Sequence, residues 1–281
     1  MFKFLIFFAN FLFFVTGYAQ SNEFDWKTSF IEELELKSYK NKLQKEFLPF
    51  FKDLYLANNP ANKDSSDRTT SIPKIIHQIW LGSPLPKEYV KFQITWKEHH
   101  PDWEYKLWTE IELATFNLKN QKAFDQAANY GEKANIWRYE ILERFGGLYV
   151  DTDYECLKPF DEFMENYEFF SGMSSLERKA LVSNALIACI PHHPIIKECV
   201  EKTNKLNWKN QKWGAPQFYK NGIFFFERII FETAQTLEQE KVNKVVIFPP
   251  SVFYPSFNKN NKEESTKHSF AIHYFDRLWM K

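Results

Sequence analysis

From residue 72 onward, the hydrophobic and polar positions follow two alternating patterns. Short apolar runs bounded by Pro, Gly or polar residues predict buried strands, and longer segments with one apolar side predict helices between them. The expected strands are Lys74–Leu81, Trp103–Leu107, Leu148–Val150, Ala185–Ile190, Val245–Phe248 and Phe270–Tyr274. Helices are expected at Tyr89–His99 and within Ala123–Phe145, where Gly146 and Gly147 favour a helix end. This alternation predicts an α/β domain with a mostly parallel sheet.

An apolar segment opens the chain. Lys3 precedes the nearly continuous apolar run Phe4–Val15, and Gly17 and Ala19 are the small residues of a cleavage site. As a helix, the run would cover roughly 18 Å, well short of a hydrocarbon core of about 30 Å. Residues 1–20 are therefore interpreted as a signal peptide, with a short uncleaved anchor as second choice. The segment predicts export or residence in the secretory-pathway lumen, with membrane association through this segment only.

Two further segments separate the leader from the main domain. Residues 21–56 are charged and carry an apolar stripe typical of a helix, which Pro49 is expected to interrupt. This helical N-terminal extension is interpreted as an arm that packs on the main domain. Residues 57–71 form a polar linker with almost no apolar content. The main domain is then expected at residues 72–281, a length that can bury a sizeable core.

Composition and charge narrow the classes of function. Lys and Arg number 36, as do Asp and Glu, and no basic stripe stands out, which argues against a dedicated nucleic-acid binder. The chain holds 9 Trp; their faces suit sugars and bases, although most are expected in the core. Cys156, Cys189 and Cys199 form no Cys-x-x-Cys pair, so a zinc site is not expected. Each is interpreted as a small buried hydrophobe, with a Cys189–Cys199 disulfide as the alternative in an exported protein.

Two carboxylates follow the short strand Leu148–Val150. In a continued strand, Asp151 and Asp153 would face one side and Thr152 the other, in the crevice that open α/β sheets form beyond the carboxyl ends of their strands. Paired carboxylates there suit Mg²⁺ or Mn²⁺, and a divalent ion removes the repulsion that would raise one pKa. Arg138 lies upstream and is suited to neutralise a leaving group at a metal–diphosphate site. A solvated turn for the carboxylates and a surface salt bridge for Arg138 are the alternatives.

The segment Arg138–Asp153, RYEILERFGGLYVDTD, resembles the signature of glycosyltransferase family 32, the DxD sugar transferases. Further segments of the chain resemble other blocks of this family, in the same order: IPKIIHQIWLG, HPDWEYKLWTE, SNALIACIPHHP, WGAP, FPPSVFYP and AIHYFDRLW. The resemblance covers residues 72–279. It implies a GT-A type α/β fold and metal-dependent, retaining transfer of a hexose from a nucleotide-diphosphate sugar. Mannose, glucose and galactose remain open as the sugar, and a glycan, a glycolipid or a protein as the acceptor.

The resemblance also implies roles for the residues of this segment. Asp153 would ligate the metal, Mn²⁺ or Mg²⁺, directly. Asp151 would hold the sugar or ribose and help to complete the metal shell. Arg138 would contact the donor sugar or its phosphate. No protein nucleophile is evident.

Four residues outside this segment are implied as well. Trp80 would stack on the nucleotide base, and the amide of Asn184 would lie near the donor sugar. His273 and Trp279 would close the site from the C-terminal side, with His273 as a candidate third metal ligand or phosphate contact. Without the resemblance, a place in the core is the ordinary interpretation of Trp80 and His273, and a place in a turn is that of Asn184.

Two positions depart from the family pattern. Asn135 stands where the family usually has Asp, three residues before the helix arginine; it would still bind the nucleotide sugar through a ribose or sugar hydroxyl, without the charge. Leu278 stands where Ser often precedes the closing Trp. They motivate an alternative, a catalytically degenerate protein that binds nucleotide sugars or carbohydrates. A metal-dependent phosphohydrolase is the other alternative, because paired aspartates also serve phosphoryl chemistry. Against it, Glu155 stands where an Asp-x-Asp phosphatase would have Thr or Val.

Overall fold

The computed structural model describes residues 42–58, 71–174, 181–203, 205, 221–239, 245–255 and 266–276. The predicted signal peptide, nearly all of the predicted linker, Leu278 and Trp279 lie outside these residues. Among the residues described, no helix combines the length and the apolar character needed to cross a bilayer.

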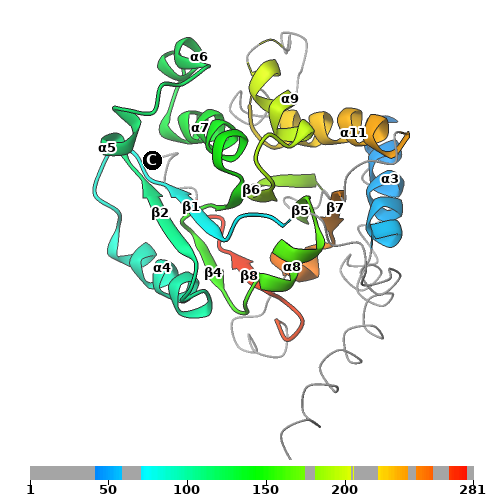
Figure 1. Cartoon of the computed structure of the whole chain (residues 1–281), viewed down its shortest axis with the longest axis horizontal. Coiled ribbons are helices and arrows are strands. Elements are labelled where there is room, and N and C mark those ends of the chain that lie inside the picture. Colours follow the sequence, from blue (N-terminus) through cyan, green and yellow to red (C-terminus); the bar gives the residue numbers. More distant parts are fainter. Residues whose placement is uncertain are drawn as a thin grey trace, which may run out of the picture.

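Within this part of the chain, a six-stranded mixed sheet forms the centre of the fold (Figure 1). In spatial order its strands are β2 (Glu104–Trp108), β1 (Ile75–Ile79), β3 (Gly147–Val150), β6 (Leu181–Cys189), β5 (Phe169–Ser174) and β7 (Val245–Phe248). β1 is parallel to β2 and β3, and β5 is parallel to β7, whereas β6 is antiparallel to both of its neighbours. The predicted α/β class with a mostly parallel sheet is confirmed. The reversal of β6 was not predicted, because an apolar run does not reveal the direction of its strand.

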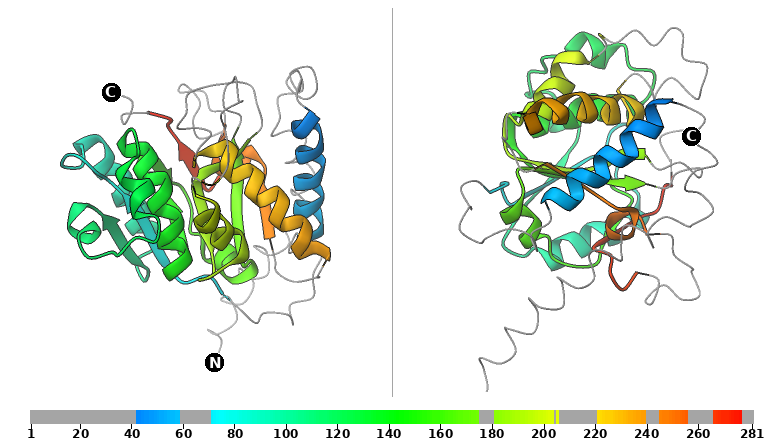
Figure 2. Two further views of the ribbon diagram at one scale, coloured as in Figure 1. Left: turned by 90° about the horizontal axis from the view of Figure 1, so that it is seen from above. Right: turned by 90° about the vertical axis from the view of Figure 1, so that its right-hand side faces the viewer.

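Helices cover both faces of this sheet (Figures 1 and 2). One face carries α7 (Tyr130–Phe145), α9 (Pro194–Lys202) and α11 (Ile223–Gln239). The other face carries α4 (Lys87–His99), α12 (Pro250–Phe253) and a small antiparallel sheet of β4 (Tyr154–Cys156) and β8 (Ala271–His273). Shorter helices are α5 (Glu110–Leu113), α6 (Gln121–Asp125) and α8 (Asp161–Asn166). The predicted last strand therefore forms, but it pairs with β4 rather than extending the central sheet.

Aromatic side chains fill much of the core between these layers. Trp96, Trp137, Tyr139, Tyr149 and Tyr154 are among the largest side chains that are fully buried. The abundance of aromatic residues thus serves packing, as expected for most of the Trp residues. The three cysteines are free and buried, which confirms their interpretation as buried hydrophobes and excludes the alternative disulfide in this structure.

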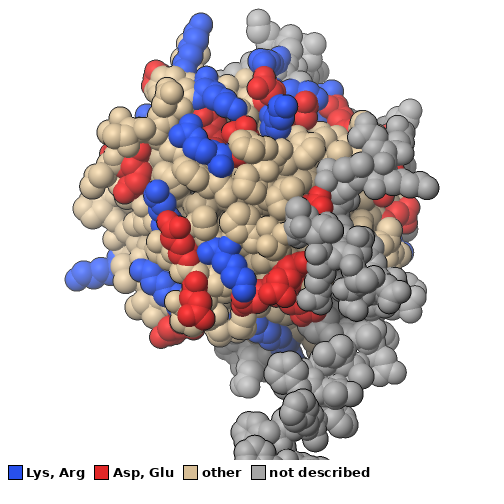
Figure 3. Space-filling model, viewed as in Figure 1, with Lys and Arg blue, Asp and Glu red and all other residues tan. Residues whose placement is uncertain are grey.

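Charged side chains of both signs share the surface. On the face shown in Figure 3, the lysines and arginines of the described residues are interspersed with acidic side chains. Exposed ion pairs occur among the described residues, such as Lys74 with Asp161 at 2.6 Å, and pairs of this kind add little to stability. The mixed charge of this face agrees with the equal numbers of basic and acidic residues in the sequence.

Helix α3 (Lys42–Asn58) contains the end of the predicted N-terminal extension. Phe47, Phe51 and Leu54 are buried, and the helix packs against β7 and α11, with the ring centroid of Phe47 4.2 Å from that of Phe231. The helix continues through Pro49, so the predicted interruption is wrong. Proline removes one helix hydrogen bond, and the burial of this apolar face offsets that loss. The boundaries of the predicted segments remain predictions.

Two glycines turn the chain from α7 into β3. Gly146 has φ of 62° and Gly147 has φ of 93°, values that glycine adopts without steric cost. A Cβ on Gly146 would lie 2.7 Å from the backbone nitrogen of Pro191, and one on Gly147 would lie 2.7 Å from the carbonyl oxygen of Ile75. The glycine pair therefore lets β3 enter between β1 and β6, which brings Asp151 to the end of the central sheet.

Candidate active site

A pocket of about 460 Å³ opens at the carboxyl ends of β1 and β3. Its walls come from the β1–α4 connection, the first turns of α7, the β3–β4 turn, part of β6 and the residues at the end of β8. This is the place where open α/β sheets bind ligands. The predicted site residues that line it are Trp80, Asn135, Arg138, Asp151, Asp153, Asn184 and His273. Trp279, the remaining member of the predicted set, lies outside the described residues.

Asp151 and Asp153 lie in the turn that joins β3 to β4. The N–H of Tyr154 donates to the carbonyl oxygen of Asp151 at 3.3 Å, and the N–H of Asp151 donates to the carbonyl oxygen of Ala185 at 2.9 Å. The side-chain amide of Gln78 donates to the carbonyl oxygen of Asp151 at 3.2 Å. The prediction that a continued strand aligns the two carboxylates is therefore wrong, since a turn held by β1 and β6 brings them together.

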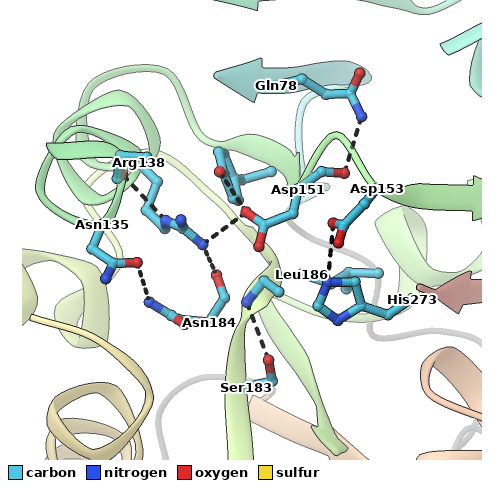
Figure 4. A network of polar contacts seen from close by, with 12 residues as sticks. Gln78, Asn135, Arg138, Asp151, Asp153, Ser183, Asn184, Leu186 and His273 are labelled. Carbon is cyan, nitrogen blue, oxygen red and sulfur yellow. Dashed lines mark hydrogen bonds and ion pairs between the residues drawn. The ribbon is translucent and has the colours of Figure 1, made fainter. Parts of the chain in front are cut away.

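Asp151 faces a buried cation (Figure 4). Nη1 of Arg138 lies 3.1 Å from Oδ1 of Asp151, and the hydroxyl of Tyr149 donates to the same oxygen at 2.7 Å. The guanidinium also lies over the ring of Tyr149, 4.4 Å from its centroid, an arrangement that attracts a cation. The side chain of Arg138 is 5% exposed, which excludes the surface salt bridge considered as its alternative.

Backbone carbonyls fix the position of Arg138. Its Nε donates to the carbonyl oxygen of Ala134 at 3.2 Å, and its Nη1 donates to that of Asn184 at 2.6 Å. The side-chain amide of Asn184 donates in turn to Oδ1 of Asn135 at 2.9 Å and to the hydroxyl oxygen of Tyr139 at 3.2 Å. Asn135 thus has a partner within the site, and its oxygen orients Asn184.

The C-terminal part of the described chain holds Asp153. Nε2 of His273 lies 3.1 Å from its Oδ1, and the backbone N–H of Asp276 donates to its Oδ2 at 2.9 Å. The imidazole of His273 stacks on the ring of Tyr154, with centroids 4.4 Å apart and planes at 4°. Nδ1 of His273 is buried and lacks a hydrogen-bond partner among the described residues. The Nε2 edge of the ring is therefore the one that faces the carboxylates.

The pKa values of the two carboxylates shift in opposite directions. Burial raises the pKa of Asp151 above its usual range; Arg138 opposes this shift and Asp153 adds to it. Burial alone would also raise the pKa of Asp153, but His273 and the N–H of Asp276 outweigh it and hold that pKa below its usual range. Asp151 keeps 30% of its side-chain surface open to the pocket. A cation beside both carboxylates would relieve their repulsion.

Asp151, Asp153 and His273 form a donor set that fits a divalent metal. One ligand atom of each lies within 4.8 Å of the other two. Carboxylate oxygens suit both Mg²⁺ and Mn²⁺, whereas Mg²⁺ strongly prefers an all-oxygen shell. Because an imidazole nitrogen joins the two carboxylates here, the set suits Mn²⁺ better than Mg²⁺.

Aromatic residues and a glycine shape the mouth of the pocket. Trp80 follows β1, and its indole N–H donates to the hydroxyl of Ser83 at 3.3 Å while its ring meets that of Tyr89 edge to face. The half-exposed ring of Tyr130 lies against Gly82, where a Cβ would come within 2.2 Å of a ring carbon. Gly82 also has φ of 90°, so the mouth requires glycine at this position.

Some lining residues were not predicted from the sequence: Tyr89, Tyr130, Tyr149 and Phe275. A signal existed for Tyr149, because a strand residue two positions before Asp151 faces the same side. The other three follow apolar patterns that also fit an ordinary core, so the sequence offered no signal for them.

Comparisons with known proteins agree with this geometry. Residues 86–170, which include Arg138, Asp151 and Asp153, match a family model described as "Glycosyltransferase sugar-binding region containing DXD motif". The paired carboxylates thus lie in a segment that matches the sugar-binding region of DXD glycosyltransferases. Residues 86–170 of the chain thus resemble this glycosyltransferase family, in agreement with the resemblance seen in the sequence.

Three individual proteins that the chain resembles share 25% of their aligned residues with it, or fewer. The chain is 25% identical over 238 residues to "Inositol phosphoceramide mannosyltransferase 3" of Schizosaccharomyces pombe, a match that covers 83% of this chain and 63% of the relative. It is 23% identical over 327 residues to "Initiation-specific alpha-1,6-mannosyltransferase" of Candida albicans, with 90% and 85% covered. The solved structure "PaToxG Glycosyltransferase" aligns with a TM-score of 0.49 at 15% identity, with 70% of this chain and 80% of that chain covered. The match thus spans less than two thirds of the Schizosaccharomyces pombe protein.

Proposed function

We propose that this protein is a metal-dependent hexosyltransferase that takes its sugar from a nucleotide-diphosphate donor. The observation that carries the proposal is the meeting of a metal-type donor set, Asp151, Asp153 and His273, with the buried cation Arg138 in one pocket. The family match over residues 86–170 supports it. The names of the relatives favour mannose as the sugar, with glucose and galactose as alternatives.

The site residues divide the work between the metal and the donor phosphates. Asp151, Asp153 and His273 would hold Mn²⁺, which when bound supplies positive charge to the departing nucleoside diphosphate. Arg138 adds a permanent charge that carbonyl oxygens hold in place before any substrate arrives, as electrostatic stabilisation requires. Its Nε and Nη1 make those contacts, so we expect the Nη2 donors to face the phosphate or the sugar.

The remaining lining residues would orient the donor and admit the acceptor. Trp80 offers a half-buried aromatic face for the base, and Asn184, held by Asn135, offers an amide beside the sugar. The bond from the sugar C1 to the diphosphate breaks as an acceptor hydroxyl attacks from the same face, which retains the configuration, and gives its proton to the departing diphosphate. The acceptor would be a glycan, a glycolipid or a protein, reached in the secretory lumen or after export.

Turnover of candidate donors tests the proposal. GDP-mannose, UDP-glucose and UDP-galactose are incubated with the wild type, with Asp153→Ala and with the exposed control Asp125→Ala, in Mn²⁺ and in EDTA. We expect release of nucleotide from one donor in Mn²⁺, unchanged in the control and reduced about a thousandfold in Asp153→Ala. Equal turnover by Asp153→Ala, or equal turnover in EDTA, would contradict the assignment.

A further inference from the structure

Strand β6 carries a bulge where it passes the pocket. On β5, Ser171 pairs with Ile187 and the next residue, Gly172, pairs with Ser183. Residues 184–186 of β6 therefore have no counterpart on β5. Such a bulge redirects side chains and backbone groups, and bulges are frequent beside functional sites.

The bulge supplies the groups that arrange one half of the site. The carbonyl oxygen of Asn184 accepts from Nη1 of Arg138 at 2.6 Å, and the side-chain amide of Asn184 reaches Asn135. The carbonyl oxygen of Ala185 accepts the backbone N–H of Asp151 at 2.9 Å. The conformation of these residues thus sets where Arg138 and Asp151 stand relative to each other.

A buried hydroxyl spans the two ends of the bulge. Oγ of Ser171 lies 2.9 Å from the carbonyl oxygen of Ser183 and 2.8 Å from that of Leu186, and Ser171 is fully buried. The single O–H donates to both carbonyl oxygens, either in a shared hydrogen bond or to one at a time. It therefore supplies a donor to two buried carbonyls that lie close together. At the start of the bulge, the hydroxyl oxygen of Ser183 accepts the N–H of Ala185 at 3.3 Å (Figure 4).

We infer that Ser171 is a positioning residue of the active site. Ser171 is not among the residues that line the pocket, so its hydroxyl acts through the bulge of β6 and not on the substrate. By bonding to the carbonyls of Ser183 and Leu186, it fixes the backbone between them. The carbonyls of Asn184 and Ala185 then lie where they accept from Arg138 and from the N–H of Asp151. The catalytic consequence of this role rests on the proposed function; the structural consequence does not.

Hydrogen exchange of the Asp151 amide tests the structural part. This N–H donates to Ala185, so a loosened bulge exposes it. We expect Ser171→Ala to speed its exchange about tenfold. The matched control is Ser269→Ala, which removes another buried hydroxyl that donates to a carbonyl oxygen, that of Ser251 at 2.6 Å; the control leaves the Asp151 amide unchanged. Unchanged exchange in Ser171→Ala would overturn the inference, whatever the enzyme does.

Binding and kinetics test the functional part. We expect Ser171→Ala to weaken Mn²⁺-dependent binding of the nucleotide, or to lower kcat, by about 10- to 100-fold, the range found for residues that orient metal-site ligands. Ser171→Cys keeps most of the volume but donates weakly, so it should resemble Ser171→Ala. Activity of Ser171→Cys at the wild-type level would show that Ser171 only fills space.

A double-mutant cycle with Asn184→Ala shows whether Ser171 acts through the bulge. Because both changes disturb the bulge of β6, we expect nucleotide binding and kcat of the double variant to be only slightly lower than those of Asn184→Ala alone. Effects that multiply would overturn the inference. If the wild type binds no nucleotide while Ser171→Ala still speeds the exchange of Asp151, the proposed function fails and the role of Ser171 in the bulge stands.

Discussion

The two carboxylates of the site are held by different parts of the molecule. Asp151 is held from within the core, by Arg138 of α7 and Tyr149 of β3. Asp153 is held by His273 of β8 and by the backbone of Asp276, at the C-terminal end of the described chain. The first half forms with the central sheet, whereas the second is complete only when β8 has paired with β4. Changes in the first half should therefore cost stability and function together, and changes in the second should cost mainly function.

The largest combined loss of stability and function is expected at Arg138. Arg138→Gln leaves the buried carboxylate of Asp151 without its cation, which costs about 3 kcal/mol of unfolding free energy. It also removes the charge that faces the donor phosphates, so the catalytic efficiency should fall by about 100-fold or more. Urea denaturation and donor turnover measure the two losses, with the exposed Arg144→Gln as control. An Arg138→Gln variant that is inactive but as stable as the wild type would contradict the claim that changes around Asp151 cost stability and function together.

A change at His273 should separate function from stability. His273→Gln removes the imidazole from the donor set, so the affinity for Mn²⁺ in the presence of nucleotide should fall about 10- to 100-fold. The loss of stacking on Tyr154 should cost only about 1 kcal/mol of unfolding free energy. Titration of Mn²⁺ and urea denaturation are compared with His192→Gln, which changes an exposed histidine. Unaltered Mn²⁺ affinity would remove His273 from the metal site.

Glu227 offers a buried carboxylate that, unlike Asp151, is not paired with arginine among the described residues. It accepts the N–H of Val182 at 3.1 Å, and burial, opposed by that hydrogen bond, raises its pKa from 4.5 to about 8. The folded state therefore binds more protons than the unfolded state between these values. The contribution of Glu227 to the free energy of unfolding is therefore fully present below pH 4.5. It is lost as the pH rises toward 8, by up to about 1.4 kcal/mol per pH unit.

Glu227→Gln should remove this dependence, because its neutral amide does not titrate. The measurement is the difference in unfolding free energy between wild type and variant at about pH 5 and about pH 8, on either side of most of this window, with the exposed Glu201→Gln as control. We expect the variant to gain relative to the wild type as the pH rises. A difference that does not change with pH would show that Glu227 is ionised in the fold.

The smallest effect is expected at Asn135, the position that departs from the family pattern. In Asn135→Asp, a carboxylate oxygen still accepts from Asn184, so the Michaelis constant for the donor should change by about fivefold at most. Steady-state kinetics with one donor measures this. If the catalytic efficiency instead rose by about 100-fold or more, the native asparagine would be impairing the enzyme, as the degenerate alternative holds.

Much of the fold could be predicted, because buried runs and glycines record local structure. The strands β1, β2, β3, β6 and β7 and the helices α4 and α7 match segments predicted from hydrophobic pattern. Strands β4 and β5 were missed, since Tyr154–Cys156 is very short and Phe169–Ser174 lacks alternation. The direction of β6 and the pairing of β8 with β4 depend on tertiary contacts that no local pattern records.

The site residues also differ in whether local sequence pattern could predict them. Arg138 and Asp151 belong to one segment whose spacing already suggested a cation near paired carboxylates. His273 entered only through the family resemblance, because it meets Asp153 from 120 positions away. Ser171 gave no signal at all, since the value of its hydroxyl depends on a bulge in the neighbouring strand.

Metal-dependent binding of nucleotide tests the central claim most directly. The thermal unfolding midpoint of residues 22–281 is measured with UDP, GDP, UDP-glucose, UDP-galactose and GDP-mannose, each in Mn²⁺ and in EDTA, for the wild type and for Asp153→Ala. A ligand that binds the folded state raises this midpoint. We expect an increase with one nucleotide class, in Mn²⁺ only, that is lost in Asp153→Ala. A cooperatively unfolding wild type that shows no increase with any of these ligands, or the same increase in EDTA, would contradict this claim.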